Sequence, residues 1–409
     1  IVPARPISSR NFAPFAVQTL QPRKPTTTND TDFTDDADPV FSSVFIRVHP
    51  WLHPPEWQTA GKFCVPIARA FPQLRREPPP THPFPMKTPL RLLAALALTA
   101  AATRAADIRI GLIGLDTSHV IAFTKALNDP QAKDRVLGGR VVAVFKGGSA
   151  DIPSSANRVE GYTADLLKYP GIKLYDTVAE LLKNVDAVMI ESVDGRPHLG
   201  FAREVLPSGK PTFIDKPVGG SLRDAIEIYA LAKKHNTPVF SSSSLRQAVQ
   251  IAMQGVKYGE LRGAQSFGPC ELEPHHPDLF WYGIHAVETL YTVMGRGCQS
   301  VVRTHTENAD VVTGVWSGDR VGTMRGNRNT KGAYGLTVFG STNVVSPELK
   351  VNYNPLLREV VKFFETRVAP VTPEETVEIM AFMEAADESK RRGGAPVTIA
   401  EVMKANQPR

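Results

Sequence analysis

The feature of this sequence that most constrains its fold is an apolar run that ends in a glycine turn, at residues 108–119. Ile108–Ile113 predicts a buried strand, Gly114 a tight turn, and the residues up to His119 the start of a helix. A strand, a glycine turn and a helix in this order hold the pyrophosphate in dinucleotide-binding folds. Asp116 and His119 replace the second and third glycines of that pattern, so the strand favours a nucleotide site and the turn indicates a modified one.

The altered turn has two interpretations. In the first, Thr117, Ser118 and the backbone amides at the helix start bind an anion. Asp116 would then repel phosphate unless its carboxyl group is protonated, pointed away or paired, for instance with His119. In the second, Asp116 or Ser118 caps the helix, and the turn holds no nucleotide.

Residues 107–240 alternate between apolar strands and amphipathic helices. Alternation of this kind predicts an α/β fold, here a Rossmann-type, doubly wound parallel sheet covered by helices on both faces. The expected strands are Ile108–Ile113, Val141–Phe145, Ala187–Ile190, Thr212–Ile214 and Val239–Ser241. The expected helices are Val120–Leu127, Val178–Leu182, Leu199–Leu206 and Leu222–His235, and an unusual insert occupies Ser149–Pro170.

Residues 241–409 follow a different pattern, which predicts an α+β domain with an open, mostly antiparallel sheet. Strands with a period of two are expected near Gly263–Phe267 and at Ser300–Thr306, Val311–Trp316, Val321–Arg325 and Gly335–Phe339. Helices are expected at Arg246–Lys257, Tyr282–Met294, Asn354–Glu365 and Glu375–Arg391, and the C-terminal helices could pack back on the first domain.

The first 106 residues are expected to lie outside the working protein. Residues 1–85 hold 16 of the 34 prolines, which favours a non-native or disordered leader. From Met86 to Ala106 a basic start, the apolar run Leu92–Ala102 and small residues predict a secretory signal peptide, with a buried N-terminal helix as the alternative. We therefore expect export to the periplasm or outside the cell, and no other membrane association.

Charge and cysteine usage exclude some classes of function. Of the formal net charge of +6, only +1 belongs to residues 107–409, so the body gives no electrostatic argument for nucleic-acid binding. Cys270 and Cys298 are the cysteines of the body; an oxidising compartment permits a disulfide between them without implying one. A loop with His275, His276 and Asp278 fits no standard zinc spacing, and we expect no metal.

Four places in the body resemble the Gfo/Idh/MocA family of nicotinamide-dependent sugar oxidoreductases. They are the strand and turn ending at Gly114, the block from Asp186 to Asp215-Lys216-Pro217, Tyr282-Gly283-Ile284-His285, and Ala385-Ala386-Asp387-Glu388-Ser389. The resemblance covers about residues 107–400, and the order and spacing of the blocks are more specific than any one motif. It implies the two-domain fold, a bound nicotinamide and a pairing of subunits through the second sheet.

The resemblance also implies catalytic residues. The family carries Glu-Lys-Pro where this chain has Asp215-Lys216-Pro217, and its lysine lies where nicotinamide and sugar meet. A lysine there can relay the hydroxyl proton as hydride leaves carbon. His285 matches the family histidine that meets the substrate hydroxyl, but Trp281 stands where the family has Asp, which puts the usual proton relay in doubt. Tyr282 is a further candidate.

Other positions are expected to hold cofactor or substrate. Lys146 stands where an acidic residue would bind the adenosine ribose, which slightly favours NADP over NAD. Arg246, His276 and Trp281 are the substrate candidates. The full cofactor set is Gly111, Gly114, Asp116, Thr117, Ser118, His119, Lys146, Ser192, His198, Asp215, Lys216 and Pro217.

The sequence thus predicts an exported NAD(P)-dependent oxidoreductase that acts on a secondary alcohol or ketone of a sugar or sugar derivative. One alternative is a non-redox binding or scaffold protein on the same fold. A second is a lyase, hydratase or glycosidase that uses transient oxidation by bound nicotinamide.

Overall fold

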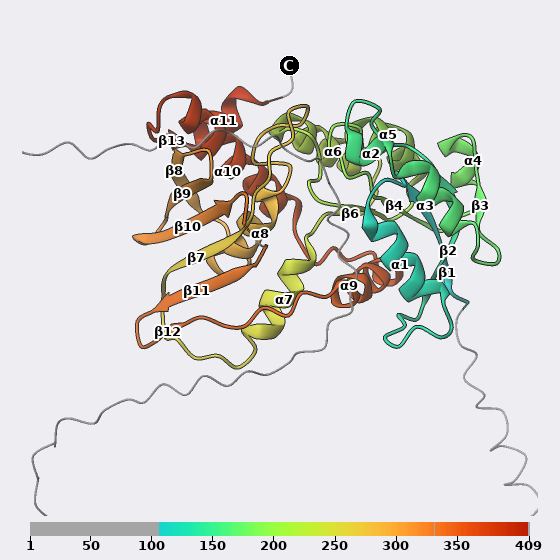
Figure 1. Ribbon diagram of the computed structural model, residues 1–409, viewed down its shortest axis with the longest axis horizontal. Helices are drawn as coiled ribbons and strands as arrows, with labels where there is room; N and C mark the ends of the chain where they lie inside the picture. The colour runs from blue at the N-terminus through green and yellow to red at the C-terminus, as the bar shows by residue number, and fades with distance from the viewer. Residues whose placement is uncertain (1–105, 331, 408–409) are drawn as a thin grey trace, which may run out of the picture. The chain divides into compact units, whose positions relative to one another are not determined.

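The computed structural model describes residues 106–330 and 332–407 (Figure 1). The predicted leader and all but the last residue of the predicted signal peptide lie outside these ranges. Within them, no helix is long and apolar enough to cross a membrane.

The first sheet has six parallel strands in the order β3-β2-β1-β4-β5-β6. The chain moves outward from β1 to β2 and β3 and then returns to place β4 on the other side of β1. This reversal is a topological switch point, where open α/β sheets bind ligands outside the carboxyl ends of their strands. The strands are β1 (Ile108–Ile113), β2 (Gly139–Phe145), β3 (Lys173–Leu174), β4 (Ala187–Ile190), β5 (Thr212–Ile214) and β6 (Val239–Phe240).

Helices connect these strands, as the alternating pattern predicts. The predicted insert forms two short helices, α2 (Pro153–Ala156) and α3 (Val159–Leu166), and α3 packs against the helix that follows β1. Gly111 of β1 packs closely against α4 (Val178–Leu182), since a side chain at this position would collide with Leu181. The other helices are α1 (Ser118–Asn128), α5 (His198–Val205), the 3-10 turn η1 (Leu206–Ser208) and α6 (Leu222–Lys234).

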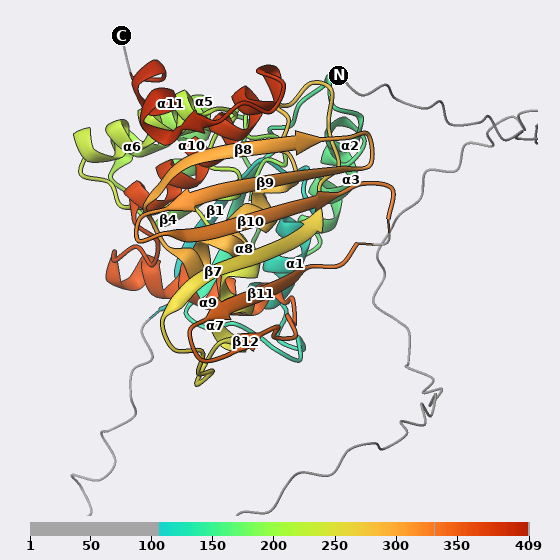
Figure 2. The same cartoon turned by 90° about the vertical axis from the view of Figure 1, so that its left-hand side faces the viewer.

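The second sheet has seven strands in the order β12-β11-β7-β10-β9-β8-β13. Its pairs are antiparallel except β7 with β10, which are parallel. In Figure 2 one face of this sheet is open toward the viewer, and α8 (Gly283–Met294) and α10 (Pro373–Arg391) lie behind it. The strands are β7 (Leu261–Pro269), β8 (Cys298–His305), β9 (Ala309–Trp316), β10 (Arg320–Asn327), β11 (Gly335–Gly340), β12 (Val344–Val345) and β13 (Val397–Thr398).

Helix α9 (Tyr353–Thr366) returns to the first domain after the second sheet is complete. Its buried residues Leu357 and Val360 share an apolar core with Ile110 of β1. The remaining helices of this half are α7 (Ser244–Ala252) and α11 (Ile399–Ala405). The core of the first domain therefore includes a helix from the second half of the chain.

The second domain also contains a fully buried arginine. Arg303 of β8 binds three carboxylates: Asp310 at 2.7 Å, Asp278 at 2.9 Å and Asp387 at 2.5 Å. A buried cation needs such partners, because the loss of hydration is otherwise not offset. Asp278 is thus part of a structural ion cluster. Cys270 and Cys298 are buried free thiols, and burial raises the pKa of each to about 12.

Candidate functional site

The turn after β1 has the backbone that the sequence predicts. Gly114 has φ +89°, which favours glycine, and a Cβ at this position would overlap the side chain and backbone of Ser192. Thr117 caps α1, and its hydroxyl accepts a bond from the amide of His119 at 3.4 Å. Residues 114–117 are buried, whereas Ser118 is exposed.

Asp116 is turned into the protein. One carboxylate oxygen accepts a bond from the Ser155 hydroxyl at 2.6 Å, and the other accepts one from the amide of Val193 at 3.0 Å. Burial raises the pKa of Asp116, and these bonds only partly oppose the rise. The predicted partner of Asp116, His119, binds a different carboxylate. Asp116 therefore escapes the clash with phosphate because it is paired and directed inward.

The α2–α3 segment covers the turn. Besides the bond from Ser155, the Ser149 hydroxyl donates to Asp194 at 2.6 Å, and both groups are buried. The backbone of Gly147 lies against Gly114. Lys146, the predicted 2′-phosphate ligand, forms an ion pair with Glu160 of α3 at 2.8 Å. The insert therefore lies beside the place expected for the adenosine half of a dinucleotide.

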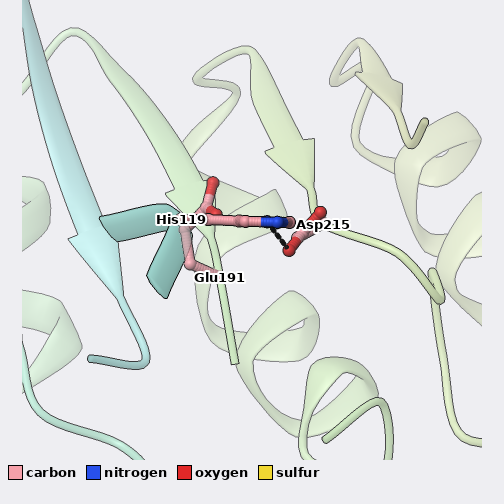
Figure 3. A group of neighbouring side chains, drawn as sticks. All are labelled: His119, Glu191 and Asp215. Atoms are coloured by element: carbon pink, nitrogen blue, oxygen red, sulfur yellow. Dashed lines mark hydrogen bonds and ion pairs between the residues drawn. The ribbon is translucent and has the colours of Figure 1, made fainter. Parts of the chain in front are cut away.

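Three buried polar side chains face one another at the ends of β4 and β5 (Figure 3). His119 Nδ1 contacts Asp215 Oδ2 at 2.6 Å, and Asp215 Oδ1 accepts a bond from the amide of Lys216 at 2.8 Å. Among the described residues, neither carboxylate oxygen of Glu191 has a hydrogen-bond partner. Burial, and then the charge of Asp215, raise the pKa of Glu191 well above its ordinary value. Although burial opposes it, the contact with His119 lowers the pKa of Asp215.

The predicted catalytic residues come together beside this cluster. The Lys216 ammonium lies 5.8 Å from the centre of the Tyr282 ring, and the rings of Tyr282 and His285 are 5.7 Å apart. His285 Nδ1 is 2.8 Å from the Ser243 hydroxyl oxygen. Burial, with the nearby charge of Lys216, lowers the pKa of His285 well below its ordinary value, so the ring is neutral near pH 7. The Lys216–Pro217 peptide bond is cis.

Two more cofactor candidates lie at the end of β4. The buried Ser192 hydroxyl has no partner among the described residues, so a bound ligand could satisfy it. The His198 ring lies between two backbone carbonyls, that of Pro217 at 2.9 Å and that of Ser192 at 3.0 Å. His198 therefore ties the loop after β4 to the loop after β5, and burial lowers its pKa.

The three substrate candidates are mostly engaged with the protein. Arg246 is buried and forms ion pairs with Glu288 and Glu375, both at 2.8 Å. His276 Nε2 accepts a bond from the amide of Gly195 at 3.2 Å, and its ring packs on the buried Trp281. Of the three, Arg246 and Trp281 thus have structural contacts that suffice to explain their positions.

The loop weighed as a metal site does not form one. His275 is exposed and pairs with Glu273 at 2.8 Å, while Asp278 belongs to the Arg303 cluster. Sequence reasoning missed Glu191, Asp194 and Ser155. Glu191 directly follows a buried strand, and that position was the signal that could have identified it.

Fold and site together define a two-domain protein with a dinucleotide-type sheet and a polar centre where that sheet meets α8. The Gfo/Idh/MocA oxidoreductase family, with its NAD-binding Rossmann fold, matches residues 108–243. The first domain therefore has the NAD-binding Rossmann fold of this oxidoreductase family. No curated protein sequence matches the chain.

Solved structures resemble the described fold over most of its length. A probable dehydrogenase from Thermotoga maritima is 18% identical, with 72% of this chain and 100% of that chain covered and a TM-score of 0.58. The myo-inositol dehydrogenase from Lactobacillus casei, solved with NAD(H) and myo-inositol, is 16% identical, with 72% and 97% covered and a TM-score of 0.57. At such identities the likeness establishes the fold.

The residues present fit the nicotinamide half of a cofactor near the end of β4, and they restrict the space for its pyrophosphate at the β1–α1 turn. Near the end of β4 the partnerless Ser192 hydroxyl and the close approach of Gly114 leave polar groups for a ligand. At the β1–α1 turn Asp116 is directed inward, which removes the expected repulsion, and its bond from Ser155 holds the α2–α3 segment next to the place where a pyrophosphate would bind.

Proposed function

We propose that this protein transfers hydride between a nicotinamide cofactor and a secondary alcohol or ketone of a sugar or polyol. The observation that carries the proposal is the meeting of Lys216, Tyr282 and His285 where the first sheet joins α8. Lys216 of the first domain lies 66 positions before Tyr282 and 69 before His285 of the second domain, yet the three form one polar group. The inositol dehydrogenase likeness supports a polyol as the substrate class.

The cofactor, when bound, supplies the hydride acceptor or donor. Thr117 and Ser118 at the start of α1 would bind its pyrophosphate, and Ser192 and Lys216 would lie beside its nicotinamide half. A preference for NADP would rest on Lys146, whose exposed ammonium is shared with Glu160. Comparing the dissociation constants of NAD and NADP tests that preference directly.

In this scheme the chain's own residues handle the hydroxyl proton. Lys216 is buried beside Asp215 and Glu191, so its ammonium can hold a substrate oxygen by a charge-assisted bond. His285 is neutral, and because Nδ1 is engaged by Ser243, Nε2 is the nitrogen that would meet the hydroxyl. The exposed Tyr282 side chain would bound the substrate on the solvent side.

The direct test supplies the full chain with NAD or NADP and a panel of inositols, sugars and sugar acids. We expect reduced nicotinamide to form with at least one polyol, and Lys216→Met to abolish it. Lys234→Met is the matched control, since Lys234 is exposed in the last turn of α6 and is not among the predicted cofactor or substrate residues. Turnover that persists in Lys216→Met, or folded protein that binds neither cofactor, would contradict the proposal.

A second candidate function is a non-redox binding protein, which is favoured by the inward, paired Asp116 at the β1–α1 turn. It predicts ligand binding that is unaffected by Lys216→Met and no turnover with any cofactor. Turnover of substrate without net reduced nicotinamide would instead indicate a lyase or glycosidase that uses transient oxidation.

We also propose that the chain self-associates through the open face of the second sheet. Phe267, Val315, Val321 and Phe339 place four exposed apolar side chains on this face (Figure 2). Light scattering of the wild type and of Val321→Lys tests the association.

Export is proposed from residues 86–106 alone, and N-terminal sequencing of secreted protein tests it.

A further inference from the structure

We propose that His119, Glu191 and Asp215 form a binding site for a divalent transition-metal ion, with Zn²⁺ as the favoured ion. One ligand atom from each residue lies within 4.8 Å of the other two, and all three residues are buried. They come from the start of α1 and the ends of β4 and β5, so the strand ends hold them in place (Figure 3). The proposal does not depend on the proposed hydride transfer.

The geometry is close to what an ion requires. Two ligand atoms bonded to one Zn²⁺ at about 2.1 Å lie about 3.4 Å apart in a tetrahedral shell. Ligand atoms that are up to 4.8 Å apart would approach each other by up to about 1.4 Å, and the His119–Asp215 contact of 2.6 Å would widen by about 0.8 Å. Three protein ligands leave room in the coordination shell for water or a substrate oxygen, as in catalytic zinc sites.

Glu191 is the observation that indicates a missing ligand. Its side chain is completely buried and directed at His119 and Asp215, yet within the described part of the chain neither oxygen has a donor. Buried carboxylates are normally paired or bound to metals. His119 and Asp215 satisfy each other, whereas Glu191 gains a partner only if something enters the cluster.

The donor set selects the class of ion. One imidazole nitrogen and two carboxylate oxygens suit Zn²⁺ or another first-row divalent ion better than Mg²⁺, which prefers an octahedral set of oxygens. The site is distinct from the loop around His275, whose residues bind elsewhere. Zn²⁺ is therefore the probe, with Mg²⁺ as the competitor.

The test measures zinc in the full chain purified without chelator and then titrates Zn²⁺ into chelator-stripped protein by calorimetry. We expect one Zn²⁺ per chain that excess Mg²⁺ does not displace, and a higher melting temperature with zinc. Glu191→Gln and His119→Gln should each weaken Zn²⁺ binding by at least about tenfold. Loss of a group that only supports a metal ligand already lowers metal affinity by about tenfold or more. His275→Gln, which changes an exposed histidine, should bind as the wild type does.

No stoichiometric zinc in the wild type, or equal binding by Glu191→Gln and the wild type, would overturn the site. If the variants do not fold, X-ray absorption of the zinc-loaded wild type decides. One imidazole and otherwise oxygen ligands support the site, whereas no histidine, or two or more, refute it.

Discussion

Replacing Ser155 with alanine should make the protein bind dinucleotides more tightly. The Ser155 hydroxyl is fully buried, donates to Asp116 at 2.6 Å and accepts from the amide of Ser149 at 2.8 Å. The bond to Asp116 joins the α2–α3 segment to the turn at which the pyrophosphate would bind, whereas the bond from Ser149 lies within the insert. The alanine variant loses both, and no atom of Ser155 belongs to the proposed chemistry.

The expected magnitude follows from the bond to Asp116. A hydrogen bond to a charged group contributes about 1.5–3 kcal/mol, which gives about 2 kcal/mol in favour of the segment lying over the turn. If cofactor binds only when the segment is open, the apparent affinity is scaled by the open fraction. Removing about 2 kcal/mol from the closed state then strengthens the binding of NAD or NADP by up to about 30-fold.

Calorimetric titration of the folded wild type and Ser155→Ala with NAD and NADP measures this effect. Glu160→Gln is the control on the same segment, because it removes only a solvent-exposed ion pair and should change the affinity by less than about fivefold. An affinity in Ser155→Ala equal to or weaker than that of the wild type, with circular dichroism unchanged, would refute the idea that the segment limits entry.

Three further outcomes are expected. Lys216→Met should lower the turnover rate by about 10²–10⁴-fold, the usual contribution of an acid–base group, and leave cofactor affinity within about tenfold; a rate within about threefold of the wild type would speak against a catalytic lysine. Burial lowers the pKa of His276 to about 4, so the free energy of unfolding is highest above pH 6.5 and falls by about 3 kcal/mol as the pH drops toward 4. Denaturant titrations at both pH values should show a loss that is larger by this amount in the wild type than in His276→Gln, and equal losses would contradict it. Arg303→Met leaves buried carboxylates unpaired and should cost about 3–5 kcal/mol of unfolding free energy, with a loss below about 1 kcal/mol as the contrary result.

Most of the fold could be predicted because its strands are continuous apolar runs. β1, β4 and β5 have the predicted bounds, since each is completed by packing on both faces. β3 has only two residues, both exposed, and its pattern is too short to recognise. The parallel pairing of β7 with β10 also escaped prediction, because it joins segments separated by two other strands and no local period reports it.

The site was predictable only where a residue stands at a fixed place after a strand. Lys216 and Pro217 follow β5 directly, and His285 opens a helix with a strong apolar pattern, so their positions are visible in the sequence. The contact of His119 with Asp215 joins residues 96 positions apart, and no spacing rule connects them. The sequence suggested Asp116 as the partner of His119 because Asp116 is close along the chain, whereas the fold supplies Ser155 to Asp116.

The departures from the glycine pattern form one connected arrangement. Asp116 fills the position of the second glycine and is held by Ser155 of the insert. His119 fills the position of the third and is held by Asp215, with Glu191 against both. Each larger side chain therefore has a partner from a different segment, and restoring glycine at 116 alone would leave the Ser155 hydroxyl and the Val193 amide as buried donors without an acceptor. The turn has consequently been rebuilt together with its surroundings, and its chemistry has to be inferred from those partners rather than from the glycines it lacks.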